Sequence, residues 1–249
     1  MIDEAPNPKP ESQTGQLEDP NLEMDSSLDL RPSPVDPWLL WQLADSAFPT
    51  GGFAHSNGLE AAWQQGEVRG RADLLAWLEA DLQQVGHAGL PFVMAAYDAP
   101  EAVGEIDAYC EAFTSNHVAN RASRAQGRAF LAAAERIFEP EIGRRTAELP
   151  CAHFAPVFGA CLRQLSVSRE TTARMFFFQH LRAVLAAAVR LNIVGPMEAQ
   201  TLLRKLSPKA GVVLKACERL TLEQAAQTSP LLDLWQGAQD RLYSRLFQS

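Results

Sequence analysis

Apolar residues recur with the period of an α-helix over most of the chain. Between residues 71 and 89, one broad helix face consists of Leu74, Leu75, Leu78, Leu82 and Val85. A second face in residues 168–192 consists of Phe177, Leu181, Val184, Leu185, Ala188 and Leu191. The sequence has no alternating runs rich in Val, Ile and Thr, which are typical of strands. The pattern predicts an all-α fold of roughly eight to ten helices.

Capping residues and prolines predict where some of these helices begin and end. Asp36–Pro37, Ser207–Pro208 and Ser229–Pro230 each place a capping side chain before a proline suited to the first helical position. Residues Thr221–Gln224 have the spacing of a capping box. Gly195–Pro196 predicts the end of one helix and the start of the next.

The first 36 residues differ from the rest in composition and charge. They are proline-rich and carry nine acidic and two basic residues, which accounts for −7 of the net charge of −8. With few large apolar side chains, this segment cannot offset the entropy cost of ordering. We expect a disordered acidic tail at 1–36, followed by a single helical domain at 37–249.

Charge and hydropathy exclude several classes of protein. The body after the tail is nearly neutral, so it lacks the basic field expected of a nucleic-acid-binding protein. No apolar run approaches the roughly 20 residues that a membrane-spanning helix needs. The acidic N-terminal stretch is the reverse of a signal peptide. These features predict a cytoplasmic protein that binds neither nucleic acid nor membrane.

Neither a metal nor an organic cofactor is expected from the sequence. The four cysteines are widely spaced without a C-x-x-C pair, so we expect them to be reduced and mostly buried. Cys151 and His153 are close enough to share a metal ion, but two ligands do not make a site. The remaining histidines show no metal-binding spacing.

The stretch "PTGGFAHSNGLE" at 49–60 combines glycines with potentially reactive side chains. It lacks the lysine of a phosphate-binding P-loop and the G-x-S-x-G of a nucleophile elbow. The better interpretation is a turn between two helices, with a contact surface that includes Phe53, His55 and Glu60. A small helical hydrolase that uses His55 and Ser56 stays open as an alternative.

Two further stretches are candidates for partner binding. Arg121, Arg124 and Arg128 form one basic stripe on a predicted helix, which suits a solvated face or an anionic partner. The final stretch, "SPLLDLWQGAQDRLYSRLFQS", stays amphipathic to within two residues of Ser249. Its apolar and arginine side chains predict docking on a partner or packing on the body.

Four blocks together resemble the urease accessory protein F (UreF) family. They are "LADSAFPTGGFAHSNGLEAAWQQGEV", "NRASRAQGRAFL", "AAAVRLNIVG" and the final stretch, and they occur in the family's order over about residues 38–249. Phe53, His55 and Glu60 match the glycine-rich signature. Arg245, Leu246 and Phe247 match the S-R-L-F block, beside Tyr243. "NIVGPMEAQ" and Asn57 depart from the usual pattern.

The resemblance implies an all-helical homodimer that is not an enzyme and has no cofactor. Such a protein joins UreD (also called UreH) and the GTPase UreG, regulates the GTPase, and supports nickel insertion into apo-urease. From the residue patterns and the resemblance together, the expected partner-binding residues are Phe53, His55, Glu60, Arg121, Arg124, Tyr243, Arg245, Leu246 and Phe247. A metallochaperone that stores nickel itself is the third function that the sequence leaves open.

Overall fold

The computed structural model describes residues 36–138 and 149–249, which contain α-helices and short 3₁₀ or π segments but no strand. The α-helices are α1 (Pro37–Ala44), α2 (Leu59–Gln64), α3 (Arg71–Gln84), α4 (Leu90–Asp98), α5 (Val103–Phe113), α6 (His117–Ile137), α8 (Phe154–Gln164), α9 (Arg169–Arg190), α10 (Pro196–Cys217) and α11 (Pro230–Ala238). The prediction of an all-α fold is confirmed. The predicted disorder of residues 1–36 concerns a segment that, apart from Asp36, lies outside the described residues.

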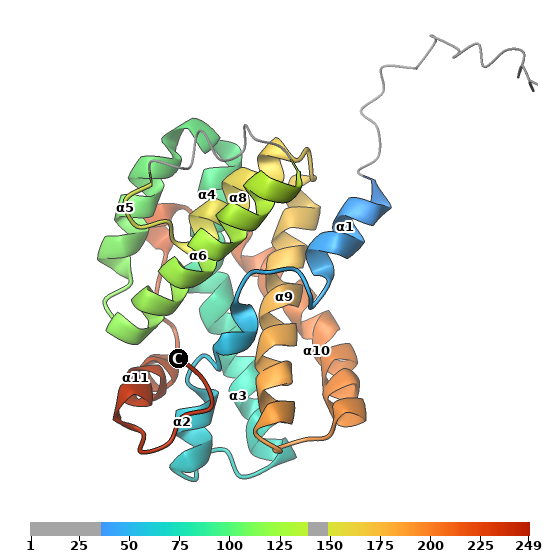
Figure 1. The fold of residues 1–249 in the computed structure, drawn as a ribbon, viewed down its shortest axis with the longest axis vertical. Coiled ribbons are helices and arrows are strands. Elements are labelled where there is room, and N and C mark those ends of the chain that lie inside the picture. Colours follow the sequence, from blue (N-terminus) through green and yellow to red (C-terminus); the bar gives the residue numbers. More distant parts are fainter. Residues whose placement is uncertain (1–35, 139–148) are drawn as a thin grey trace, which may run out of the picture. The chain divides into compact units, whose positions relative to one another are not determined.

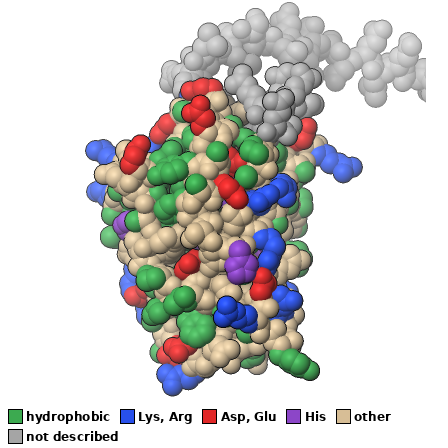
Figure 2. Space-filling model, turned by 90° about the vertical axis from the view of Figure 1, so that its left-hand side faces the viewer, with side chains coloured by type: hydrophobic (Ala, Val, Ile, Leu, Met, Phe, Trp, Pro, Cys, Tyr) green, Lys and Arg blue, Asp and Glu red, His purple; other side chains and the backbone are tan. Residues whose placement is uncertain are grey.

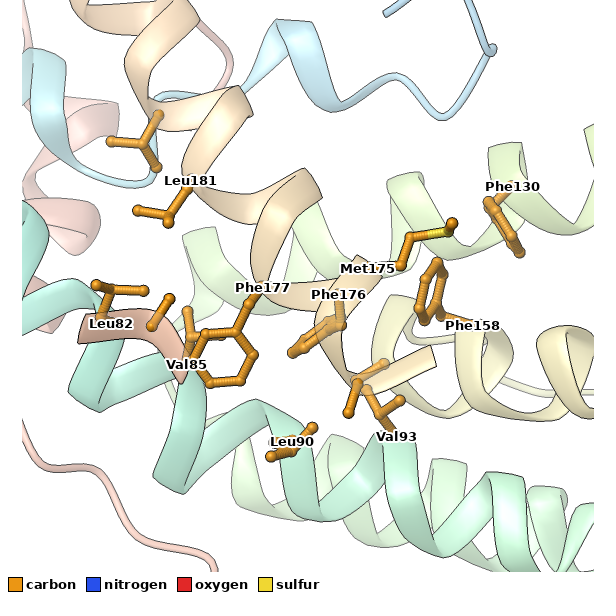
Figure 3. Close-up of a cluster of buried hydrophobic side chains, with 14 of the residues drawn as sticks. Leu82, Val85, Leu90, Val93, Phe130, Phe158, Met175, Phe176, Phe177 and Leu181 are labelled. Atoms are coloured by element: carbon orange, nitrogen blue, oxygen red, sulfur yellow. The ribbon is translucent and has the colours of Figure 1, made fainter. Parts of the chain in front are cut away.

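Helix α9 lies at the centre of the fold, with α10 packed beside it and α4, α6 and α8 around its first half (Figure 1). The predicted face at 71–89 continues without a break into α4 through a π segment, Val85–Gly89. In Figure 3, Phe177 of α9 lies against this segment. Gly86 permits the contact, because a β-carbon there would come within 3.4 Å of the Phe177 ring and 2.7 Å of Val213.

The core is one continuous cluster of buried apolar side chains. Its most aromatic part joins three helices: the rings of Phe130, Phe154, Phe158 and Phe176 lie with neighbouring centroids 5.4–6.2 Å apart. Three of the four cysteines are also buried, and Cys151 is partly exposed. The expectation that the cysteines are mostly buried is therefore confirmed.

Several predicted helix boundaries are confirmed. The Asp36 side chain accepts a hydrogen bond from the backbone of Trp38, and α10 begins directly after Gly195. Thr221–Gln224 forms a capping box, although the helix it caps is a single 3₁₀ turn. Helix α11 begins at Pro230, but the Ser229 hydroxyl bonds to the carbonyl of Ala80 instead of capping it.

The predicted helix start at Ser207–Pro208 is wrong, because Pro208 lies inside α10. The proline is on the exposed face of that helix. The opposite face buries a continuous apolar stripe on both sides of it, including Leu202, Leu206, Ala210 and Val213. Burial of this stripe outweighs the roughly 3 kcal/mol that an interior proline costs a helix.

The described residues include no helix with the length and apolar character needed to cross a membrane.

Candidate functional site

The final residues of the chain pack against the glycine-rich turn, which joins two stretches that the sequence analysis singled out separately. We call residues 239–249 the terminal segment and residues 49–60 the glycine-rich corner. The backbone N–H of Gln248 donates to the carbonyl of Ala54 at 2.8 Å. The carbonyl oxygen of Ser249 accepts from the backbone N–H of Ser56 at 2.5 Å and from its hydroxyl at 2.9 Å. The terminal segment therefore docks on the body of the protein.

Glu60 is the main polar anchor of the terminal segment. It lies in the first turn of α2 and is only 2% exposed. Its carboxylate accepts hydrogen bonds from the backbone N–H groups of Leu246 at 2.7 Å and Phe247 at 3.0 Å, and from the side-chain amide of Gln239 at 2.6 Å. Charge-assisted bonds of this kind are stronger than neutral ones, and the helix N-terminus also favours a carboxylate.

His55 lies under the same segment. Its Nδ1 atom is 2.7 Å from the hydroxyl of Ser249, and the side chain is buried. Burial lowers the pKa of His55 from 6.5 to about 4, and the positive charge of Arg121 adds to the effect. The imidazole is therefore neutral at physiological pH.

This burial predicts that acid loosens the docked segment. Because the pKa of His55 is lower in the docked state than in the released state, the released state binds the proton first as the pH falls. Docking free energy should fall between about pH 6.5 and pH 4, by up to about 3 kcal/mol. Hydrogen exchange of residues 242–249 across this range measures the effect. The variant His55→Asn should show a weaker pH dependence, and an unchanged profile would contradict the prediction.

Ionic contacts hold the outer side of the terminal segment against α6. The guanidinium of Arg121 donates to both carboxylate oxygens of Asp240, at 2.8 and 3.1 Å. His117 and Arg245 bond to the same carboxylate. The hydrogen bond from Arg121 holds the pKa of Asp240 below its usual value. Part of the predicted arginine stripe thus positions the terminal segment.

Arg190, at the end of α9, contacts both the glycine-rich corner and the terminal segment. Its guanidinium lies 4.2 Å from the ring centroid of Phe247 and 5.6 Å from that of Phe53. It also donates a hydrogen bond to the carbonyl of Phe53. Cation–π contact therefore fixes the buried Phe247 while Phe53 stays 72% exposed.

Apart from the arginines, the predicted partner-binding residues fall into two groups. His55, Glu60 and Phe247 are buried, so they can serve a partner surface only by holding it in place. Three side chains point outward: Phe53, Tyr243 (fully exposed) and Leu246 (52% exposed). Figure 2 shows the side of the molecule that carries α5, α6 and α11, where hydrophobic patches lie among basic and acidic side chains.

The arginines belong to neither group. Arg121 and Arg245 bond to Asp240, whereas Arg124 lies 3.7 Å from Glu111, in a different cluster. Gln239, Asp240 and Arg190 were not among the site residues predicted from the sequence. Polar residues that form hydrogen bonds within the protein have the same local sequence pattern as polar residues exposed to solvent. No sequence signal therefore distinguished these three residues from solvent-exposed ones.

The contacts of His55 and Ser56 disfavour a hydrolase. Both side chains are buried, and each directs its hydrogen bond to Ser249. A serine nucleophile needs its hydroxyl bonded to a base and open to a substrate. The two residues therefore have a positioning role in the docked terminal segment.

The geometry defines an all-helical protein whose terminal segment is fastened to a glycine-rich corner and presents exposed apolar side chains. Comparison with known proteins assigns the chain to a family. The UreF family model matches residues 68–207. The urease accessory protein F of rice (Oryza sativa subsp. indica) is 39% identical over 220 residues, which cover 84% of each chain.

The corresponding protein of Arabidopsis thaliana is 39% identical over 224 residues, covering 85% of this chain and 92% of its own. The urease accessory protein UreF of Trichodesmium erythraeum is 30% identical over 221 residues, covering 84% of this chain and 94% of its own. The chain belongs to the UreF family. The resemblance found in the sequence is confirmed.

Proposed function

We propose that this protein is a non-catalytic scaffold in urease maturation, acting in the cytoplasm. It assembles with a UreD/UreH protein and the GTPase UreG, regulates the GTPase, and supports nickel insertion into apo-urease. Family membership supports this assignment. The homodimer proposed for the protein rests on the same resemblance.

The exposed side chains of the terminal segment are the structural observation that supports this proposal. The terminal segment is held by Glu60, Arg121 and Arg190, yet it exposes the whole side chain of Tyr243 and half of Leu246. Exposed apolar side chains on a pre-organised backbone are typical of interface anchors, because little entropy is lost on binding. We propose that Tyr243, Leu246 and the neighbouring Phe53 contact UreD/UreH.

Arg121, Arg124 and Arg245 complete the proposed partner surface. Arg121 and Arg245 share the single carboxylate of Asp240, so a partner that binds the terminal segment meets an ionic cluster with a net positive charge. Exposed ion pairs contribute little to stability, about 0–1 kcal/mol each. Their role in assembly is therefore orientation and specificity more than affinity.

The double variant Tyr243→Ser/Leu246→Ser tests the surface. Both side chains are exposed, so the variant should keep the thermal stability of the natural protein. Its affinity for UreD/UreH should fall by about 2 kcal/mol or more, roughly thirtyfold in Kd. Calorimetry or biolayer interferometry with purified UreD/UreH measures the change.

The matched control is Met197→Ser/Val212→Ser. These two side chains are also large, hydrophobic and mostly exposed, but they lie on α10. The control should bind UreD/UreH like the natural protein. If the control variant lost binding to UreD/UreH while the terminal-segment variant kept it, the interface would lie on α10 instead.

A further inference from the structure

Three potential metal ligands from two separate parts of the chain meet at one point of the structure. Glu111 lies near the end of α5, and Cys151 and His153 directly precede α8. Their ligand atoms all lie within 4.8 Å of one another. Glu111 is 42 positions before His153, which is why the sequence offered only the Cys151–His153 pair. The cluster lies outside the contacts that hold the terminal segment.

The short loop that carries the cysteine and the histidine is held by one buried carboxylate. Asp107 is fully buried and accepts three backbone hydrogen bonds. They come from Cys151 at 3.1 Å, Ala152 at 2.9 Å and His153 at 2.7 Å. This loop is therefore pre-organised before any ligand arrives.

The loop is also pressed closely against α6. A β-carbon on Gly127 would come within 2.0 Å of the carbonyl oxygen of Ala152, so the glycine is required for this approach. Ala152 itself has a φ of +57°, a left-handed conformation that costs a non-glycine residue energy. A strained backbone of this kind persists only where the surrounding contacts hold it in place, and such strain is found most often at functional sites.

His153 is oriented as a metal-binding histidine requires. Its Nδ1 atom is 3.0 Å from the hydroxyl of Ser123, and its Nε2 atom is 2.7 Å from Glu111. At this distance Nε2–H donates to the Glu111 carboxylate. Metal binding requires the other tautomer, in which Nδ1–H donates to Ser123 and the lone pair of Nε2 is directed toward the ion. The histidine ring is buried, whereas the Glu111 side chain is 38% exposed and Cys151 is partly exposed, so an ion can enter from solvent.

We propose that Glu111, Cys151 and His153 bind one borderline divalent cation of the zinc type, with the fourth position left to water. A thiolate, an imidazole and a carboxylate are the ligands that Zn²⁺ and its neighbours accept, and three protein ligands leave an exchangeable position. Binding forms a metal–sulfur bond and releases the thiol proton of Cys151 to solvent. This inference does not depend on the urease partners.

Small movements complete the site. Ligand atoms of a tetrahedral zinc ion lie about 3.5 Å apart, so the 2.7 Å contact between His153 and Glu111 opens by roughly 1 Å. Glu111 is exposed enough to turn. Asn120 steadies its Oε2 at 3.0 Å, and Arg124 lies 3.7 Å from its Oε1. The charge of Arg124 opposes the cation, so Arg124→Gln should tighten binding.

Calorimetric titration of Zn²⁺ into the reduced full-length chain tests the site. We expect one ion per chain with a Kd of about 1 µM or below. Cys151→Ala and Glu111→Gln should each weaken binding by more than the roughly tenfold expected for Ser123→Ala, which acts through His153. The controls Cys217→Ala and Glu105→Gln, a buried thiol and an exposed acid elsewhere, should bind like the natural chain.

Co²⁺ provides an independent spectroscopic readout. A thiolate-to-cobalt charge-transfer band should appear with the natural chain and vanish in Cys151→Ala, while circular dichroism shows that the variant stays folded. The proposal is overturned if the natural chain binds no stoichiometric Zn²⁺. It is also overturned if the cobalt band survives in Cys151→Ala, or if Glu111→Gln binds as tightly as the natural chain.

Discussion

Replacing Glu60 by glutamine is expected to release the terminal segment from the body while the helical core stays folded. The carboxylate accepts three hydrogen bonds from the terminal segment, and the Glu60 side chain is only 2% exposed. A glutamine keeps one acceptor oxygen but turns an NH₂ group toward N–H donors. Since hydrogen bonds to a charged group contribute about 1.5–3 kcal/mol each, docking should weaken by about 3 kcal/mol or more.

Hydrogen exchange of residues 242–249 measures this release directly. In Glu60→Gln the amides of Leu246 and Phe247 should exchange many times faster than in the natural protein, and affinity for UreD/UreH should fall with them. Glu67→Gln is the matched control, because Glu67 is an exposed acid just beyond α2. Unchanged protection of Leu246 and Phe247 in Glu60→Gln would show that Glu60 is not the anchor.

Gly58→Ala is the second substitution with a large expected effect. Gly58 precedes α2 with a φ of +84°, and a β-carbon there would lie 2.7 Å from the backbone nitrogen of Gln236 in α11. Alanine therefore adds both backbone strain, about 1 kcal/mol, and displacement of α11, about 1–3 kcal/mol. We expect a loss of about 3 kcal/mol in the free energy of unfolding, measured by denaturant melts.

Gly66 separates the two causes. It has a similar φ of +80°, but a β-carbon there meets nothing within 4 Å. Gly66→Ala should therefore cost only the strain, about 1 kcal/mol. Equal losses in the two variants would mean that α11 does not press on Gly58.

Periodicity predicted the helices well where burial followed a simple face. The apolar positions of 168–192 became the central helix α9, and the Gly195–Pro196 break separates it from α10. The prediction from capping residues failed at Ser207–Pro208. There the local signal for a helix start competed with an apolar stripe that is buried by tertiary packing, and the helix continued through Pro208. Long-range packing decides such conflicts, and a single sequence does not display it.

The candidate site was predictable as two stretches but not as one structure. The glycine-rich corner and the terminal segment stood out through composition, yet nothing in either showed that they bind each other. Glu60 illustrates the reason: an acid at a helix start has the same pattern whether it faces solvent or accepts three hydrogen bonds. Glu111 is a parallel case, because only the fold brings it to His153.

We propose that this chain is the scaffold of a urease-maturation complex, assembled through its terminal segment. The most direct test is size-exclusion chromatography of the purified chain mixed with UreD/UreH and nucleotide-loaded UreG. We predict that all three proteins elute as one complex, and that Tyr243→Ser/Leu246→Ser elutes apart from both partners. Separate elution of the natural chain, or an intact complex with the double variant, would contradict the account.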